Sequence, residues 1–143
     1  MGLLDLFRPK VNAKNADGLT ALMRTAGMGH TETAKMLIDK GADINAKNAD
    51  GLTALMRAAY EGHTETAKML IDKGAKIDSK NKKGVTALMY TAGMGHTETA
   101  KMLIDKGADI NAKDDKVSLT ALSWATQRGH TETIEMLIDK GAV

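Results

Sequence analysis

Residues Asn48 to Lys80 read NADGLTALMRAAYEGHTETAKMLIDKGAKIDSK, and near copies of this stretch stand on both sides of it. The preceding residues, 15–47, differ from it at only six positions. Two landmarks mark the period: glycines 33 residues apart at Gly18, Gly51 and Gly84, and histidines 33 residues apart at His30, His63 and His96, with His130 following after 34. A fixed period of this length predicts a repeat array, in which each unit is stabilised by packing on its neighbours.

The composition agrees with an array of thin layers. The chain of 143 residues is 43% hydrophobic but only 3% aromatic, so we expect an interior of Leu, Ile, Met and Ala. Its net charge of +2 is too small to imply nucleic acid or an anionic membrane as a partner. There is no cysteine, no Asn-x-Ser/Thr sequon and no apolar run long enough to predict a membrane span. A reducing, cytoplasmic location is therefore expected.

Each unit contains the signals for two short helices. In the central copy, Thr53 precedes an apolar pattern from Ala54 to Tyr60 and can cap it, and Gly62 fits the left-handed conformation that ends a helix. A second helix is predicted from about Thr64 to Lys73, with one apolar stripe and one solvated face. The segment GAKIDSKNKKG that follows predicts a projecting loop or hairpin. The same signals recur at Thr20, Thr86 and Thr120 and at Gly29, Gly95 and Gly129.

The period divides the chain into four units and a leading half unit. We place the units at residues 15–47, 48–80, 81–113 and 114–143, and an N-terminal half-repeat cap at residues 1–14. Within the cap, four apolar residues are expected to form one or two helical turns that end at Pro9; they are Leu3, Leu4, Leu6 and Phe7. At the other end no further helix follows, so we expect the outer face of the last unit to fray or to contact another molecule.

The opening residues MGLLDLFRPK do not predict a targeting signal. This stretch is too short for a secretory signal peptide, and the acidic Asp5 stands where the apolar region of such a peptide should continue. Leu6 stands where N-myristoylation requires Ser or Thr.

A helix, a tight turn, a second helix and a projecting loop in every period resemble the ankyrin-repeat family over roughly residues 11–142. The family phrase is visible as GLTALM, GLTALM, GVTALM and SLTALS, followed in each unit by Gly-His and by a phrase of the LIDKGADIN type. The residues chosen within these phrases resemble those of bacterial members of the family. The resemblance implies an all-α repeat solenoid of stacked helix-turn-helix pairs with projecting β-hairpin loops. It also implies partner contacts at the hairpin tips and on the first helices, which face a concave groove.

Two features depart from the family phrase. Where the family has Thr-Pro-Leu-His, this chain has Thr-Ala-Leu-Met, so Met23, Met56 and Met89 are expected to pack as adaptable fillers. Between the third and fourth units, NAKDDKVSLT is one residue longer than NAKNADGLT and has Ser118 in place of the turn glycine. The tip there is expected to bulge or to be looser than the others.

No pattern predicts a catalytic, metal or cofactor site. All ligands of one zinc ion lie about 2 Å from the metal, and units stacked about 8–10 Å apart cannot place two of the histidines at that distance from one ion. Each histidine is instead expected to help start its second helix or to bond a neighbouring backbone group. The Gly-Met-Gly turns lack the third glycine and the preceding strand of a dinucleotide-binding loop. No serine lies in a Gly-x-Ser-x-Gly turn, and the carboxylates recur as capping or solvated residues. We therefore expect no enzyme activity, no cofactor and no small-molecule substrate.

The copies disagree mainly at the tips and along the first helices, whereas the second helices hardly vary. Positions that differ between near-identical units are not all needed for the fold, so their clustering favours recognition of a partner. Tyrosine, tryptophan and arginine, which dominate interface energy, gather there. The candidate partner-binding residues are Asp17, Leu19, Arg24, Met28, Asp50, Leu52, Arg57, Tyr60, Glu61, Lys82, Lys83, Val85, Tyr90, Met94, Lys116, Val117, Leu119, Trp124, Gln127 and Arg128.

Three details refine this surface. Leu19, Leu52, Val85 and Leu119 lie beside the tips, where they are expected to be exposed and available for contact. The early tips are acidic and the later ones rich in lysine, so an oppositely polarised protein would be steered into register. For Tyr90 and Trp124 the alternative is that they fill space between first helices.

The sequence therefore predicts a non-catalytic protein–protein interaction module that binds a protein partner. Two alternatives stay open. One is a homo-oligomeric or scaffold array that stacks through its uncapped C-terminal unit. The other is a polyanion or nucleic-acid binder that uses the tips at Lys80–Lys83 and Lys113–Lys116, although Asp114 and Asp115 interrupt the positive charge.

Overall fold

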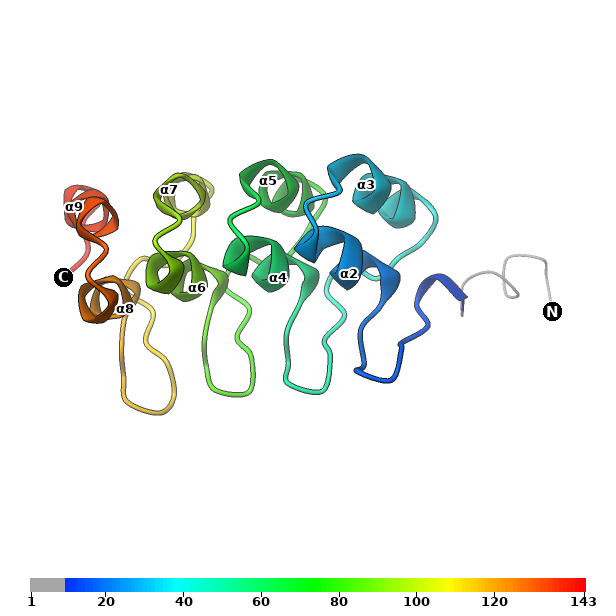
Figure 1. The fold of residues 1–143 in the computed structure, drawn as a ribbon, viewed down its shortest axis with the longest axis horizontal. Coiled ribbons are helices and arrows are strands. Elements are labelled where there is room, and N and C mark those ends of the chain that lie inside the picture. Colours follow the sequence, from blue (N-terminus) through cyan, green and yellow to red (C-terminus); the bar gives the residue numbers. More distant parts are fainter. Residues whose placement is uncertain (1–9) are drawn as a thin grey trace.

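A computed structural model describes residues 10–143 of the chain, so the expected helical cap at Leu3, Leu4, Leu6 and Phe7 lies outside the described residues. The described part is built from pairs of short helices joined by loops (Figure 1). The helices are α2 (Ala21–Gly27), α3 (Thr31–Asp39), α4 (Ala54–Tyr60), α5 (Thr64–Asp72), α6 (Ala87–Met94), α7 (Thr97–Asp105), α8 (Ala121–Arg128) and α9 (Thr131–Asp139). The predicted pair in the central unit is confirmed, with the second helix one residue shorter than expected.

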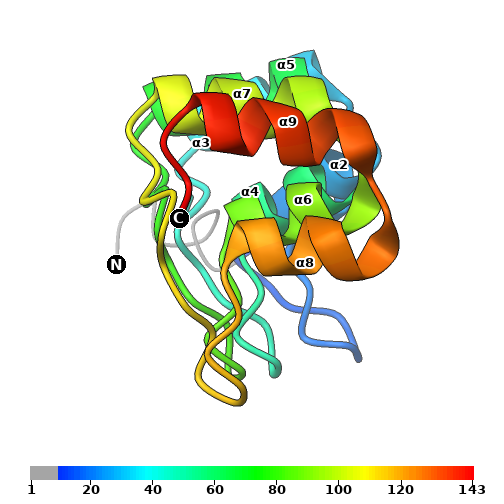
Figure 2. The same cartoon turned by 90° about the vertical axis from the view of Figure 1, so that its left-hand side faces the viewer.

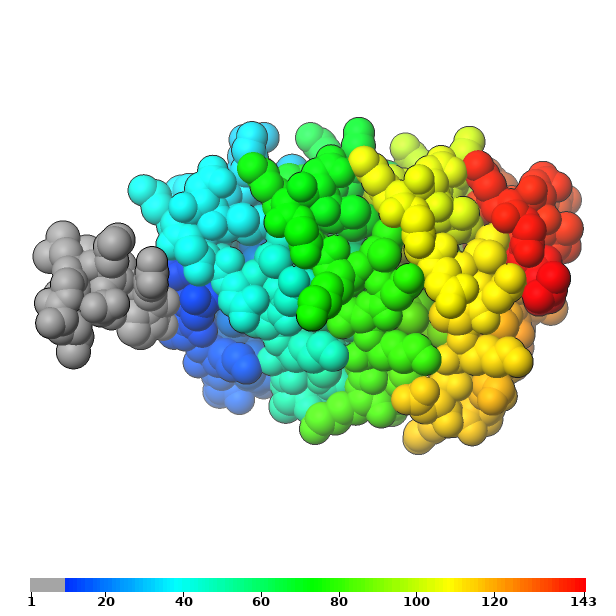
Figure 3. Space-filling view, turned by 180° about the vertical axis from the view of Figure 1, so that it is seen from behind, coloured from blue at the N-terminus to red at the C-terminus, as the bar shows by residue number. Residues whose placement is uncertain are grey.

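The helices form two layers. The first helices of the units, α2, α4, α6 and α8, contact one another in a row, and the second helices, α3, α5, α7 and α9, form a parallel row above them (Figures 1 and 2). The loops between units project from the side of the first helices. In the space-filling view of Figure 3, successive units follow one another across the surface from blue to red. The chain is thus an all-α solenoid of stacked helix-turn-helix pairs, as the sequence predicted.

Every first helix begins in the same way. The hydroxyl oxygen of Thr53 accepts a hydrogen bond from the N–H of Met56 at 3.2 Å, and Thr20, Thr86 and Thr120 make the equivalent bond. All four threonines are buried and have extended backbones, as N-cap residues do. The glycine after each first helix has a left-handed backbone, with φ of 71–74° at Gly29, Gly62, Gly95 and Gly129. Both capping predictions are confirmed.

The core consists of small and flexible apolar side chains, as the composition indicated. Met23, Met56 and Met89 are each about 1% exposed, so the expectation that they pack inside is confirmed. The alanines Ala26, Ala59, Ala92 and Ala125 are fully buried, which lets neighbouring first helices approach closely. Between the second helices, hydroxyl groups pair at 2.6 Å: Thr31 with Thr66, Thr64 with Thr99, and Thr97 with Thr133. Each unit is therefore tied to the next by apolar packing and by one buried or half-buried hydroxyl pair.

The tips are closed turns, and no strand occurs in residues 10–143. In the second unit the Asn48 side chain accepts hydrogen bonds from the N–H groups of Asp50 and Leu52, and Asn48 N–H donates to the Leu52 carbonyl. The hairpin-like shape therefore comes from an asparagine side chain and a few backbone bonds. Neighbouring tips are joined where Lys82 N–H donates to the Asp50 carbonyl at 3.1 Å.

The last tip is one residue longer, as its sequence indicated, yet it closes like the others. Asp114 takes the place of the asparagine and accepts from the N–H groups of Val117 and Leu119 at 3.0 and 3.4 Å. Asp114 N–H donates to the Leu119 carbonyl at 2.9 Å. Ser118 adopts φ 56°, the left-handed conformation that glycine has in the other tips, so the added length is absorbed at the cost of local backbone strain.

Candidate functional site

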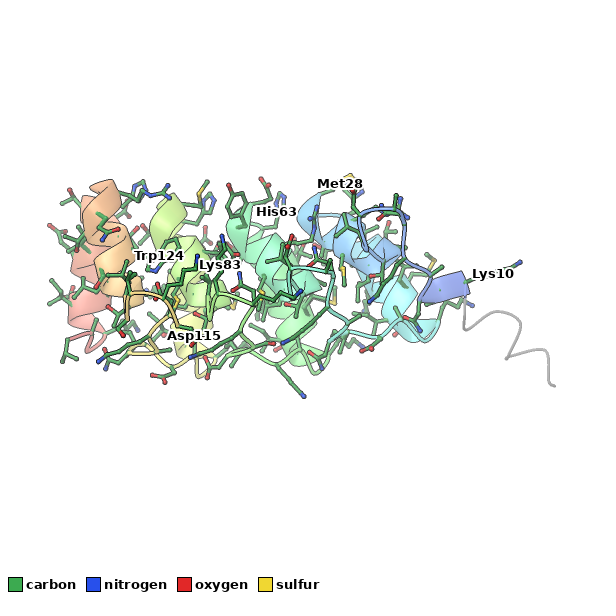
Figure 4. The ribbon with its side chains drawn as sticks, turned by 90° about the horizontal axis from the view of Figure 1, so that it is seen from below. Lys10, Met28, His63, Lys83, Asp115 and Trp124 are labelled. Atoms are coloured by element: carbon green, nitrogen blue, oxygen red, sulfur yellow. The ribbon has the colours of Figure 1, made fainter. Side chains whose placement is uncertain are left out.

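The first helices and the loop tips together form one surface, which we call the inner face. It contains two grooves that residues of neighbouring units line jointly. Most of the candidate residues from the sequence lie in or beside these grooves. Figure 4 views the molecule from the side of the tips and labels Lys83 and Trp124, which both line the second groove.

The first groove, which we call the aromatic groove, lies between α4 and its neighbours and has a volume of about 240 Å³. It is lined by Gly27, Leu52, Met56, Arg57, Tyr60, Glu61 and Tyr90. The rings of Tyr60 and Tyr90 meet edge to face, with centroids 5.6 Å apart at 79°. The structure thus brings together five candidate residues that lie up to 38 positions apart in the sequence.

Tyr90 is held firmly in this groove. Its hydroxyl oxygen accepts a hydrogen bond from the Asn81 side-chain amide at 2.7 Å. Burial raises the pKa of the Tyr90 hydroxyl above its ordinary value, so the ring is neutral at physiological pH. Tyr60, in contrast, is exposed and forms the open wall of the groove.

The second groove, which we call the basic groove, lies between the last two tips and α8 and has a volume of about 300 Å³. Its lining consists of Lys83, Val85, Asp114, Lys116, Val117, Leu119, Trp124, Gln127 and Arg128. All of these except Asp114 were candidates from the sequence. The signal for Asp114 was available, because it replaces the turn asparagine that stands at Asn15, Asn48 and Asn81.

Asp114 is buried, and its carboxylate is satisfied by the protein itself. The Val117 N–H, and after it the Leu119 N–H and the nearby Trp124 indole, hold the pKa of the Asp114 carboxyl below its ordinary value. The indole Nε1 is buried and completes no hydrogen bond, although it lies close enough to Asp114 to contribute to this shift. The negative charge of Asp114 is therefore directed at groups within the tip and the adjoining helix.

The remaining candidates lie outside both grooves. Those with exposed side chains are Asp17, Arg24, Met28, Asp50, Lys82 and Met94, whereas Leu19 is half-buried. The expectation that Val85 is exposed is wrong: it is only 4% exposed, although it belongs to the lining of the basic groove together with residues of the last unit. Leu52 and Leu119 are half-buried beside their tips.

Part of the variation between copies reflects packing between units. A methyl group at Gly93 would stand 2.9 Å from the Trp124 ring, and one at Gly27 would stand 3.2 Å from the Arg57 guanidinium. At the corresponding places in the middle of the stack, Tyr60 meets Tyr90. At the two glycines a small residue thus faces a large one in the next unit, whereas in the middle of the stack two aromatic rings meet. Trp124 therefore both fills space between first helices and lines a groove.

The histidines connect neighbouring units, as one of the two expectations for them stated. Nε2 of His63, His96 and His130 lies 3.2, 2.9 and 3.0 Å from the carbonyl oxygens of Gly27, Tyr60 and Gly93, respectively. Because a carbonyl oxygen can only accept, Nε2 carries the proton in each ring. Each histidine is also the N-cap residue of its second helix, as the other expectation stated, although its side chain makes no capping hydrogen bond.

A third groove, on the side of the second helices, is polar. Its volume is about 400 Å³, and its lining is Gly29, Thr31, Gly62, His63, Thr64, Glu65, Thr66 and Glu98. Among residues 10–143, no three histidine, cysteine or acidic side chains are placed together in a way that could hold a metal ion.

Several tip lysines are engaged within the protein. The ammonium group of Lys80 donates to the Lys113 carbonyl at 3.1 Å and lies 3.7 Å from the Asp115 carboxylate. Lys14 and Lys47 donate in the same way to the carbonyls of Lys47 and Lys80. These side chains join units to one another, and the Asp115 carboxylate offsets part of the positive charge of Lys80.

Comparison with known proteins agrees with this architecture. A family model described as ankyrin repeats in three copies matches residues 2–81 and again residues 73–143. No curated protein matched the chain in a sequence search. In the described part of the chain, no helix has the length and apolar character needed to cross a bilayer. Since the family model and the stacked helix pairs together span nearly the whole sequence, the chain belongs to the ankyrin-repeat family.

Proposed function

We propose that this chain is a non-catalytic interaction module that binds a protein partner on its inner face. Ankyrin repeats are generally protein–protein interaction modules and are typically non-catalytic. The observation that carries the proposal is the position of the two grooves. They open on the face where the copies differ in sequence, whereas the second helices, three of which read TETAKMLID, are almost invariant.

The exposed side chains of the inner face support this function. Large apolar groups are exposed there at Met28, Tyr60, Met94 and Val117, beside the charged ends of Arg24 and Arg128. Methionine, tyrosine and arginine are enriched in protein interfaces. The absence of cysteine favours a partner in the reducing cytoplasm.

The side chains that line the grooves favour binding over chemistry. The Tyr90 hydroxyl is bonded to Asn81, and the Asp114 carboxylate is bonded to backbone N–H groups. Ser123 Oγ lies 3.2 Å from the capping hydroxyl of Thr120, so it serves the start of α8. These groups hold the surface in shape, and we assign none of them a catalytic role.

The function is tested by capturing proteins from a lysate of the source organism. The wild type is compared with variants in which methionines of similar exposed fraction are replaced on different faces of the molecule. Met28→Lys combined with Met94→Lys places charge on the inner face, at residues that are 57% and 37% exposed. Met36→Lys on α3 is the control, because Met36 is 49% exposed but lies on a second helix. We expect the double variant to lose at least about tenfold in captured partner, since buried charge at an interface costs more than about 1.4 kcal/mol.

Far-ultraviolet circular dichroism of both variants checks that the helices are retained. Equal capture by the double variant and the wild type, or equal loss in the Met36→Lys control, would contradict binding on the inner face. Tyr60, Tyr90 and Trp124 are less suitable targets, because Tyr90 and Trp124 also pack between units and their removal would alter the stack.

A further inference from the structure

We propose that the basic groove recognises an acidic, extended segment of the protein partner, whose carboxylates face Lys83, Lys116 and Arg128 while an apolar side chain lies against Trp124. The proposal rests on the function proposed above and adds the chemistry of the partner. It follows from the charge, the composition and the surroundings of this groove.

The cationic side chains of the basic groove are free to meet a ligand. Lys83, Lys116 and Arg128 are all exposed, and none of them forms an ion pair with another residue in the range 10–143. Asp115 is an exposed acid on the last tip, and its N–H donates to the Lys83 carbonyl at 3.1 Å, but its carboxylate lies 3.7 Å from the ammonium group of Lys80. Three unpaired cations around one groove attract carboxylates and steer their approach.

The one acidic residue in the lining does not cancel this charge. Asp114 is buried, and its carboxylate accepts hydrogen bonds from the N–H groups of Val117 and Leu119. It is thus balanced by donors of its own tip, and the groove presents a positive surface to solvent.

Apolar groups in the same groove distinguish a protein segment from a bare polyanion. Val117 is 66% exposed at the tip, and Leu119 and Trp124 are half-buried in the lining. An aliphatic side chain that is flanked by carboxylates would satisfy both parts of this surface. A nucleic-acid backbone would need a larger set of free cations, because non-specific affinity comes from several neutralised phosphates.

The aromatic groove differs in charge from the basic groove, and this difference determines the orientation in which the segment binds. It contains Arg57 and Glu61, which have opposite signs, and the Arg57 Nε is already bonded to the Met23 carbonyl at 3.1 Å. The tips on that side carry the exposed acids Asp17 and Asp50. The acidic end of the segment is therefore expected at the last two tips, with its neutral or basic end toward α2.

The chain contains a single tryptophan, Trp124, which reports directly on the basic groove. The experiment titrates the full chain with a short synthetic peptide in which glutamates flank a leucine, and with the matched peptide that has glutamine for every glutamate. We expect Trp124 emission to change on addition of the glutamate peptide, with at least about threefold tighter binding than the glutamine peptide at low salt and a smaller difference at high salt.

Variants locate the binding site. Lys116→Gln combined with Arg128→Gln should weaken the glutamate peptide about three- to tenfold, as expected for two exposed charge pairs. Lys68→Gln combined with Lys101→Gln, which removes two exposed charges from α5 and α7, is the control and should leave the affinity unchanged.

Three results overturn the proposal: equal affinity for the two peptides, no change of emission with either, or tighter binding of a single-stranded oligonucleotide than of the glutamate peptide. The salt titration of the wild-type protein needs no variant and therefore decides the matter even if a variant is unstable. If the peptide test fails while lysate capture still depends on Met28 and Met94, only the acidic segment is refuted. If capture is also indifferent to those residues, the proposed function fails with it.

Discussion

At the scale of single residues, the contact between a glycine of one unit and the histidine of the next unit holds neighbouring units together. Gly29, Gly62 and Gly95 follow the first helices of the first three units, have left-handed backbones, and each lies against the histidine ring of the following unit. A methyl group at Gly95 would stand 2.6 Å from Nδ1 of His130, which is closer than atoms of this kind approach. The same histidine reaches the Gly93 carbonyl at 3.0 Å. Glycine is thus needed for its backbone conformation and for the space it leaves.

These two requirements can be separated by a matched pair of variants. Gly95→Ala and Gly129→Ala place alanine at nearly the same φ, 74° and 71°, but nothing lies within 4 Å of the added methyl group at Gly129. Both should lose about 1–2 kcal/mol of unfolding free energy through left-handed strain. Gly95→Ala should lose about 1–3 kcal/mol more, because the His130 ring has to move. Urea denaturation measures the unfolding free energy of both variants. Equal losses would show that the His130 ring moves aside without an energetic cost.

Asp114 gives the last tip a dependence on pH. Its folded pKa is held below the ordinary value, chiefly by the Val117 N–H, so the folded state binds this proton less readily than the unfolded chain. Its contribution to stability is present above the unfolded pKa, about 3.9, and is lost as the pH falls through the lower folded value.

Asp114→Asn removes this titration and keeps an oxygen that can accept the same N–H groups, as Asn81 does in its own tip. We expect the stability advantage of the wild type over the variant to be constant above about pH 5 and to shrink on acidification. Urea midpoints recorded across this range test the prediction. A constant difference down to about pH 2 would mean that the carboxylate is not favoured by the fold.

At the scale of elements, the ends of the first helices are matched in size to their neighbours. Gly93 in α6 leaves room for the Trp124 ring of α8, and Gly27 in α2 leaves room for the Arg57 side chain of α4. The two glycines differ in what they meet, because Trp124 presents a rigid ring and Arg57 the flexible end of a long side chain. The variation between units is therefore coordinated, and one unit cannot be exchanged for another without changing this fit.

Alanine at the two glycines should have opposite effects. Gly93→Ala should destabilise the chain by about 1–3 kcal/mol, since the methyl group would displace the Trp124 ring from 2.9 Å. Gly27→Ala should be neutral or stabilising by up to about 1 kcal/mol, because alanine favours a helix and the guanidinium can shift. Thermal or urea unfolding measures both, and Trp124 emission gives a second readout for the first. A neutral Gly93→Ala would refute the rigid fit.

At the scale of the whole molecule, burial is concentrated in the middle of the stack. α5 buries Thr66, Ala67 and Leu70, whereas α3 buries only Ala34. α4 buries five residues and α8 only two. Because the stability of a repeat array is a sum of unit and interface contributions, the helices with more buried contacts should open less often.

Hydrogen exchange can show this gradient. We expect the slowest amide exchange in α4 to α7 and faster exchange in α3, α8 and α9, at the same pH and temperature. Mass spectrometry of peptic fragments resolves the helices sufficiently. Uniform protection in all of them would indicate that the stack opens only as one cooperative unit.

Much of this fold could be predicted from the sequence because its signals are local. The capping hydroxyl of Thr53 acts on Met56, and the left-handed backbone of Gly62 depends only on adjacent residues. The period of 33 then repeats these local choices and predicts the stack. The packing of Met56 in the core was expected because methionine stands there in place of the histidine of the family phrase, and Met56 is buried.

Other features depend on residues in the next unit, and only the tertiary structure decided them. Val85 is buried and lines a groove with residues of the following unit, and His63 bonds Gly27, which precedes it by 36 positions. The fit of Gly93 to Trp124 and the gathering of Lys83 with Arg128 around one groove arise in the same way. The sequence by itself determined the unit and its repetition, because caps, turns and apolar stripes act within a few residues. The placement of one unit against the next determined which side chains remain exposed to a partner, because each inner surface is completed by residues about one period away.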